Sequence, residues 1–301
     1  MLRMSLLLLL GIIACDPCWD KADNSEILKC MASYPVEDIS PNTQLSGYLR
    51  DHKVYVSLTT SPQRISKLHW VLKSLDLTHV DTVFLALPAK YKNQESYTIP
   101  EDVRSFPKLK IIWRERDAGP IMKLIPAVEE VLKLGDPQAR VITIDDDTVY
   151  AKGMIAQLLK LSTQINGVAA LSGQTSDFFQ IPGEHWPEST MPKPLVNIVE
   201  GFGGIAYPVG LIDVALMKQA SQAGLKGVCK TSDDLVISWV LARGRVPRAT
   251  IKNAFIPGVK QLPYGFLNDS LHSGAGCSGD SCYSNNERYK ACAKALKELL
   301  L

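Results

Sequence analysis

The chain has 301 residues, enough for one large hydrophobic core or two modest ones. Hydrophobic residues make up 46% and charged residues 21%, a composition typical of globular proteins that excludes a disordered chain. The 33 Lys and Arg residues almost balance the 31 Asp and Glu residues, so the chain lacks the basic surplus of a nucleic-acid-binding protein. We therefore expect no nucleic-acid partner.

The first residues have the pattern of an export signal. Arg3 precedes an apolar run from Leu6 to Ala14, which is too short to span a bilayer comfortably. We interpret residues 1–14 as a signal peptide, with a short anchor or a buried strand as alternatives. The letters IIAC also resemble a bacterial lipobox, in which Cys15 would carry the lipid. The expected location is the secretory pathway or another extracytoplasmic compartment, with the protein secreted or tethered to a membrane at its N-terminus.

Cysteine usage agrees with export. Apart from Cys15, an even set outside the cytosol predicts three disulfides, although the sequence alone does not fix the pairing. The segment CSGDSC could close a small loop between Cys277 and Cys282. A zinc site is the rival interpretation, but no second CxxC or HxxxH motif accompanies these residues. The six cysteines are Cys18, Cys30, Cys229, Cys277, Cys282 and Cys292.

In chain order, residues 15–50 have few long apolar runs and are predicted to form a leader or stem. A catalytic body is predicted over 51–267. Strands are expected at 53–60, 81–88 and 108–113 and helices at 65–75 and 119–135, where apolar residues recur at i, i+3 and i+4 spacing.

The second half of the body continues this alternation. A fourth strand is expected at 140–144, a helix at 152–162 and a short strand at 167–173. Alternating strands and helices predict an α/β fold with a mostly parallel sheet flanked by helices, whose ligands bind at the carboxyl ends of the strands. The tail, 268–301, combines a cysteine-containing polar loop with an amphipathic terminal helix, in which Tyr289, Cys292, Leu296 and Leu299 share a face.

Three consecutive aspartates, Asp145, Asp146 and Asp147, follow the fourth predicted strand. Their charges repel one another, so a positive partner is needed. A divalent cation is the cleanest explanation, because Mg²⁺ and Mn²⁺ prefer oxygen ligands and often bind one or two carboxylates plus substrate phosphates. Strand alternation predicts Asp145 and Asp147 on one side and Asp146 on the other. An acidic turn that caps a helix or forms salt bridges is the alternative.

The stretch VITIDDDTVY resembles the DxD motif of nucleotide-sugar glycosyltransferases of the GT-A fold, especially family-2-like enzymes. Other segments resemble parts of those enzymes in the same order, over roughly residues 52–265. VSLTTSPQRISKLHWVLKSL is similar to their first strand, nucleotide-binding loop and following helix, and RDAGPIMKLIPAVEEV to the helix before the DxD strand. VEGFGGIAYP resembles their glycine-rich acceptor-side loop, and TSDDLVISWVLARGR the acidic segment that carries the base in inverting members.

The resemblance implies a GT-A-like enzyme that uses Mn²⁺ or Mg²⁺. Its donor would be a nucleotide sugar and its acceptor a hydroxyl of a glycan, protein or lipid. We expect a hexosyltransferase-like, inverting reaction. By resemblance, Asp145 contacts the nucleotide or ribose and shares the metal with Asp147, while Asp146 lies beside the nucleotide. Asp234 would be the general base, with Asp233 as the substitute.

Further residues are candidates for the donor site. Thr59, Thr60 and Arg64 follow the first strand and would lie near the base or phosphates. Lys123 lies near a helix start, where a cation and free backbone N–H groups both favour an anion, although a solvated lysine explains it equally well. Ser232 or Asp233 could merely be the N-cap of the next helix.

The glycine-rich segment and two histidine-containing segments complete the candidate list. Gly201, Gly203 and Gly204 would let the backbone approach a ligand closely, and a tight turn is the alternative. Glu200 could face the acceptor or lie at the loop edge. His272 could add a third metal ligand or be solvated. In the loop that contains His185, Trp186 could stack on a sugar or anchor the loop.

Two other functions remain open at this stage. VITIDDDTV also fits the nucleophile motif of haloacid-dehalogenase-like phosphatases, in which Asp145 would attack phosphorus with Asp147 as acid–base and Mg²⁺ between them. However, that nucleophile strand normally opens its domain, and here three predicted strands precede it. The third hypothesis is a secreted protein that binds a nucleotide sugar without catalysis.

Overall fold

The computed structural model describes residues 23–33, 43–92, 94–174, 196–251, 259–261 and 285–299. Its centre is a seven-stranded sheet in the order β3-β2-β1-β4-β7-β6-β8, with parallel pairing except where β7 runs antiparallel to β4 and β6. The predicted α/β fold with a mostly parallel sheet is confirmed. The strands are β1 (Val54–Leu58), β2 (Thr82–Pro88), β3 (Leu109–Arg114), β4 (Arg140–Thr143), β6 (Val168–Gln174), β7 (Ile198–Pro208) and β8 (Arg248–Thr250).

Helices cover both faces of this sheet, and alternate strand residues face two hydrophobic cores. Along β1, Val54 and Val56 belong to one core and Tyr55 to the other. Every residue of β1 is buried, as expected for a central strand covered on both faces. A separate two-stranded antiparallel pair joins β5 (Thr148–Tyr150) to β9 (Val259–Gln261).

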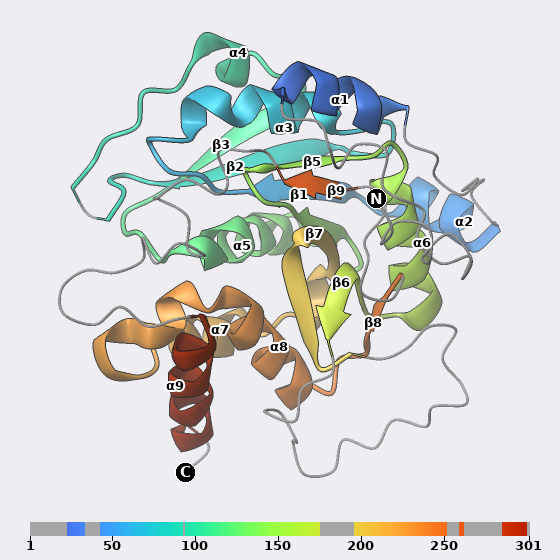
Figure 1. Cartoon of the computed structure of the whole chain (residues 1–301). Helices are drawn as coiled ribbons and strands as arrows, with labels where there is room; N and C mark the ends of the chain where they lie inside the picture. The colour runs from blue at the N-terminus through green and yellow to red at the C-terminus, as the bar shows by residue number, and fades with distance from the viewer. Residues whose placement is uncertain are drawn as a thin grey trace, which may run out of the picture.

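The core of Val54 and Val56 is closed by α1, α3, α4 and α6, and the core of Tyr55 by α5, α7, α8 and α9 (Figure 1). Predicted helices at 65–75, 152–162 and the C-terminal end are confirmed. The bounds are α1 (Asn24–Ala32), α2 (Thr43–Asp51), α3 (Leu68–Ser74), α4 (Glu101–Arg104), α5 (Ile125–Lys133), α6 (Met154–Ile165), α7 (Val214–Ser221), α8 (Asp233–Arg243) and α9 (Asn285–Glu298), with 3₁₀ turns η2 (Ile65–Lys67), η3 (Pro120–Lys123), η6 (Val209–Leu211) and η7 (Leu225–Thr231).

The described part of the predicted leader, 15–50, is not a stem. Ile27 and Met31 of α1 and Leu45 of α2 are buried in the same core as α3. The Tyr48 hydroxyl donates a hydrogen bond to the Gln138 carbonyl (3.0 Å). These segments are therefore part of the folded domain. Among the residues placed by the structure, no helix has both the length and the apolar character to cross a bilayer.

The helix predicted at 119–135 is divided into η3 and α5. Leu124 separates the two, and Pro126 lies in the first turn of α5, where its missing N–H costs nothing. Gly119 begins the segment at φ +78°, and a Cβ there would lie 2.6 Å from the Lys230 carbonyl oxygen. The glycine lets η3 pack directly against η7, which leads into α8.

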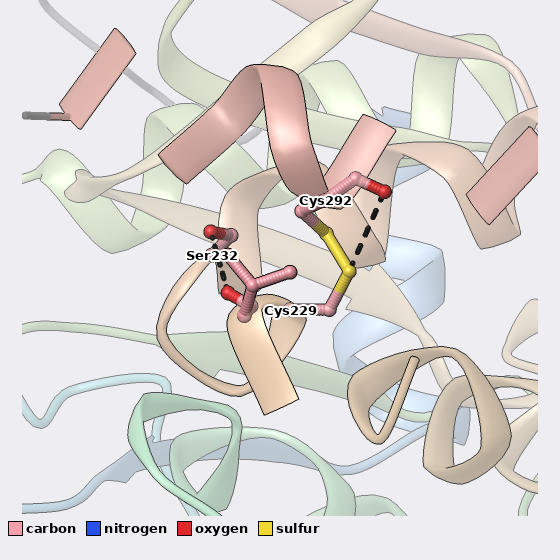
Figure 2. The surroundings of a disulfide bond; sticks show 4 residues. Cys229, Ser232 and Cys292 are labelled. Carbon is pink, nitrogen blue, oxygen red and sulfur yellow. Dashed lines mark hydrogen bonds between the residues drawn. A yellow bond between two sulfur atoms is a disulfide. The ribbon is translucent and has the colours of Figure 1, made fainter. Parts of the chain in front are cut away.

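A disulfide between Cys229 and Cys292 joins η7 to α9 (Figure 2). Cys292 and Leu296 are buried against the α8 side of the sheet, whereas Leu299 lies beyond the helix and is 36% exposed. The tail helix therefore belongs to the main core. Cys30 is also disulfide-bonded. The predicted Cys277–Cys282 loop lies outside the described residues.

Replacing both Cys229 and Cys292 with alanine is expected to lower the free energy of unfolding by about 2–4 kcal/mol, because the bond closes a long loop between residues 63 positions apart. Urea unfolding of the oxidised proteins measures the loss. Lys294→Ala, an exposed change on the same helix, is the control and should stay within about 0.5 kcal/mol of wild type. Equal stability of the double variant and wild type would contradict a stabilising role for this bond.

Candidate functional site

The ends of β1 and β4 bring the first candidate residues together. The two strands pair in parallel with Ser57 opposite Thr143, so both chains leave the sheet at the same edge. Beyond this edge the Thr60 hydroxyl donates to Asp146 Oδ2 (2.6 Å), whereas the Thr59 hydroxyl donates to the Ala86 carbonyl (2.7 Å). Both predicted nucleotide-site threonines therefore lie at the expected edge, with hydroxyls that bind protein groups.

Arg64 joins two of the three consecutive aspartates. Its NH1 lies 3.0 Å from Asp146 Oδ1 and 3.0 Å from Asp147 Oδ2. The predicted alternation is wrong here, because β4 ends at Thr143 and Asp146 and Asp147 lie in the turn before β5. Burial, together with the charge of Asp147, raises the pKa of Asp146 to about 6. Arg64, which was predicted to lie near the base or phosphates of the donor, is thus paired with two carboxylates in this structure.

Lys123 connects the aspartate run to the start of α8. Its Nζ lies 2.8 Å from Asp145 Oδ1 and 3.0 Å from Asp233 Oδ2, and its side chain is only 7% exposed. Burial opposes its charge, but the carboxylates outweigh burial and raise the pKa of Lys123 well above its ordinary value. Lys123 is therefore neither a solvated lysine nor an open anion-binding one, because it is buried and paired with two carboxylates. Lys123 is a buried link between two segments of the site.

Asp234 has the chemical character expected of a base. Its Oδ1 accepts a hydrogen bond from the Gly201 N–H (2.9 Å). Burial and the charge of Asp233 raise the pKa of Asp234 to about 8, although Lys123 and the Gly201 N–H act in the opposite direction. Asp233 instead pairs with Lys123. Ser232 is the N-cap position of α8, but its side chain makes no capping bond.

The glycine-rich segment is neither a loop nor a tight turn. It forms β7, which pairs antiparallel with β4, with Thr143 opposite Ile205. The residues of β7 that precede Ile205 therefore extend past the carboxyl end of β4, on the side of the aspartates. Gly203 and Gly204 lie within this strand, packed near Leu171 and Met154. These two glycines therefore lie against core side chains. Glu200 accepts a hydrogen bond from the Ser172 hydroxyl.

Gly201 is the glycine that the site needs. A Cβ there would lie 2.7 Å from Lys123 Nζ and 3.1 Å from Asp234 Oδ1. Any side chain at this position would have to displace the end of the Lys123 or the Asp234 side chain.

Gly201→Ala is therefore expected to displace the Lys123 ammonium or the Asp234 carboxylate and to lower the free energy of unfolding by about 1–3 kcal/mol, in the range of overpacking in a filled core. Thermal and urea unfolding measure this effect. The control is Gly47→Ala in α2, where the nearest atom is 3.9 Å away and alanine should stabilise the helix by about 0.5–1 kcal/mol. If Gly201→Ala unfolds like wild type while Gly47→Ala is stabilised, the close packing at Gly201 is absent in solution.

Tyr150 is a residue that the sequence did not identify. Its hydroxyl accepts a hydrogen bond from the Asp145 N–H (3.0 Å) and donates one to the Phe202 carbonyl (3.1 Å). It thus fixes the backbone of Asp145 to β7. Its position in an apolar segment directly after the aspartates could have identified it, because a buried tyrosine hydroxyl usually requires a polar partner.

A divalent cation fits this group of side chains by charge. Among the described residues, Lys123 and Arg64 form ion pairs with the cluster and Arg288 lies close enough to interact with Asp233 and Asp234, and these three cations face five carboxylates. The raised pKa values of Asp146 and Asp234 reflect burial and this excess of negative charge. Asp145 is the most accessible of the paired carboxylates, with 28% of its side chain exposed. The carboxylates are Asp145, Asp146, Asp147, Asp233 and Asp234.

Some predicted ligands cannot be placed. His272, His185 and Trp186 lie outside the described residues. Within the described ranges, no three His, Cys, Asp or Glu side chains are grouped as a ready metal site. A cavity of about 780 Å³ is lined by Tyr150, Lys152, residues of α1, the end of α3 and the segment 75–78 that follows it, and none of the site carboxylates lines it.

The geometry disfavours the haloacid-dehalogenase interpretation. The nucleophile strand of that family opens its domain, whereas the aspartates here follow the fourth strand of the chain, after β1, β2 and β3. The later acidic motif of that family follows a buried strand, whereas the segment directly before Asp233 is the 3₁₀ turn η7.

The sequence matches no protein-family model and no curated protein. Among solved structures, the chain is similar to a protein assigned as a glucose-1-phosphate thymidylyltransferase from Bacillus anthracis, with 13% identity, TM-score 0.41 and coverage of 80% of this chain and 99% of the other. It is also similar to glucosyl-3-phosphoglycerate synthase from Mycobacterium tuberculosis in complex with Mn²⁺, UDP and phosphoglyceric acid, with 13% identity, TM-score 0.42 and 72% of each chain covered. A third is TarS of S. aureus, with 14% identity, TM-score 0.39 and coverage of 70% and 61%. At such values these likenesses assign no substrate or reaction to this chain.

Proposed function

We propose that this protein is a metal-dependent, GT-A-like glycosyltransferase that moves a sugar from a nucleotide-diphosphate donor to an acceptor hydroxyl. The observation that carries the proposal is the Lys123 bridge, because it joins Asp145 at the end of β4 to Asp233 at the start of α8. A donor-side carboxylate and the acidic segment expected to hold the base are thereby brought into one cluster at the carboxyl edge of the parallel strands, where ligands of such sheets bind.

A bound Mn²⁺ or Mg²⁺ would supply the positive charge that a departing diphosphate needs. Asp145 and Asp147 would hold it, with His272 as the proposed further ligand. Asp145 is suited to this role because it is the most open of the four carboxylates that form ion pairs, and Tyr150 holds its backbone in place. Asp147 can serve only when Arg64 releases it.

Asp234 is proposed as the general base that takes the proton from the acceptor hydroxyl. A base is most effective when its pKa lies near the working pH, and the Asp234 pKa of about 8 meets that condition. Asp233 is less suited because Lys123 occupies its Oδ2. A base acting directly on the acceptor corresponds to inversion at the sugar, which we include in the proposal.

We also propose that the protein works outside the reducing cytosol. Support comes from the Cys229–Cys292 disulfide, since such bonds persist mainly in oxidising compartments. The apolar run at 6–14 is consistent with export. Whether the N-terminus is cleaved, lipidated at Cys15 or kept as a membrane tether is a question for mass spectrometry of the protein from its native membrane and soluble fractions.

The test of the function is a screen of nucleotide sugars against the purified chain, with Mn²⁺, with Mg²⁺ and with EDTA. Release of a nucleoside diphosphate that requires the metal and an acceptor supports transfer. Release of inorganic phosphate from phosphomonoesters would instead support the phosphatase alternative. Metal-dependent donor binding without turnover on any acceptor would support a binding protein.

A further inference from the structure

Arg64 occupies the carboxylates on the metal side of the cluster. A single nitrogen, NH1, makes 3.0 Å ion pairs to both Asp146 and Asp147. The other oxygen of each carboxylate is also used, because Asp146 Oδ2 accepts from the Thr60 hydroxyl and Asp147 Oδ1 from the Thr148 hydroxyl (3.2 Å). Arg64, Asp146 and Asp147 are each at most 13% exposed in their side chains.

This arrangement closes Asp147 to a second cation. A divalent ion that coordinated Asp147 Oδ2 would lie next to the guanidinium, and like charges a few ångströms apart repel strongly in a buried site. Asp145 is different, because its partner Lys123 is shared with Asp233 and its side chain is 28% exposed. A metal could therefore reach Asp145 first, and full coordination would require Arg64 to move.

A diphosphate offers Arg64 an alternative partner of the same kind. The planar guanidinium binds phosphate oxygens as well as it binds carboxylate oxygens. The residue also belongs to the turn that follows β1, at the edge where a donor is proposed to bind. An exchange from carboxylate to phosphate would free Asp147 and keep the guanidinium paired.

We propose that Arg64 is a lock on the metal site: in the donor-free protein it blocks Asp146 and Asp147, and the diphosphate of the donor draws it away so that metal and diphosphate bind together. This inference rests on the proposed function. It makes metal binding weak without a diphosphate and strong with one. The lock would keep the site from filling with metal before the donor arrives.

The experiment measures Mn²⁺ binding by electron paramagnetic resonance at pH 8, with and without inorganic pyrophosphate. Free Mn²⁺ is corrected for the Mn²⁺–pyrophosphate complex. In wild type, pyrophosphate should tighten Mn²⁺ binding by about 5–150-fold, the usual size of coupling between two ligands. Arg64→Gln should bind Mn²⁺ alone on the order of tenfold tighter than wild type and lose most of the coupling. Arg64→Lys should keep part of it.

Two further variants make the result decisive. Arg64→Gln/Asp146→Asn removes one charge of each sign and serves if the single variant fails to fold. Arg104→Gln removes an exposed arginine whose contact with Glu101 is 3.9 Å, and it should behave as wild type.

Several outcomes separate the lock from the function. The lock is overturned if Arg64→Gln and Arg64→Gln/Asp146→Asn bind Mn²⁺ no more tightly than wild type and pyrophosphate still tightens that binding to the same extent. This result leaves the glycosyltransferase proposal standing. If neither wild type nor any of the variants binds Mn²⁺, with or without pyrophosphate, both the lock and the metal requirement are overturned.

Discussion

Asp234→Asn is expected to lower the rate of sugar transfer by about 100- to 10,000-fold, the usual contribution of a general base. The amide is nearly the same size as the carboxylate but cannot accept a proton at neutral pH. The side-chain oxygen can still accept from the Gly201 N–H, so donor binding should change little. Steady-state kinetics and calorimetric donor titration measure the two effects separately. Transfer at the wild-type rate would place the base elsewhere.

The same variant should change how stability depends on pH. The folded-state pKa of Asp234 is raised from 3.8 to about 8, chiefly by burial and then by the charge of Asp233. Between these values the folded protein binds a proton that the unfolded chain has lost, so Asp234 makes the free energy of unfolding fall as pH rises, by at most about 1.4 kcal/mol per pH unit. Asp234→Asn removes this contribution. In kinetic terms, wild-type transfer should rise with pH and level off above about 8.

Urea unfolding between pH 5 and pH 9 tests the stability effect. The control is Asp213→Asn, at the N-cap of α7, where asparagine caps as well as aspartate does. It should keep both the activity and the pH slope of wild type. An Asp234→Asn protein with an undiminished slope would show that Asp234 is already ionised at pH 5.

Lys123→Met is expected to lower the free energy of unfolding by about 3–5 kcal/mol, because it leaves the buried Asp233 and the partly exposed Asp145 without their cation. Donor binding should also fall, since Asp145 is no longer held toward α8. Thermal and urea unfolding at several pH values measure the change.

Lys133→Met is the control for this prediction. Lys133 is the last residue of α5, and its side chain is 69% exposed. Its ion pair with Glu130 (2.9 Å) is a surface contact that contributes at most about 1 kcal/mol. Adding Asp233→Asn to Lys123→Met removes one of the stranded charges and should recover part of the stability. A Lys123→Met protein as stable as wild type would mean that the lysine is not the bridge of the site.

Sequence periodicity predicted the sheet and most helices because strands buried on both faces and amphipathic helices have strong local patterns. β1 and β4, which position Thr60 and Asp145, lie within their predicted ranges. The segment at 199–208 was predicted as a loop because it resembles the glycine-rich acceptor-side loop of GT-A enzymes. In the structure these glycines permit close packing within β7, which is a property of neighbouring segments that a local pattern does not contain.

The sequence predicted which residues belong to the candidate site better than it predicted which of them contact one another. The aspartates, Arg64 and Lys123 do meet, but ion pairs between distant segments decide which faces which. The side of Asp146 depends on the turn that follows β4, and the partner of Lys123 depends on how η3 packs against η7. Within the described part of the chain, the positive partners of the aspartate run are therefore an arginine and a lysine.

The most direct test of the proposed chemistry is calorimetric titration of nucleoside diphosphates into the purified chain, with Mn²⁺ and with EDTA, for wild type and for Asp145→Asn. We expect one diphosphate to bind wild type in Mn²⁺, with little or no binding in EDTA and a much weaker response in the variant. Binding that is equally tight in EDTA, or unaffected by Asp145→Asn, would contradict a metal-bound diphosphate at this carboxylate cluster.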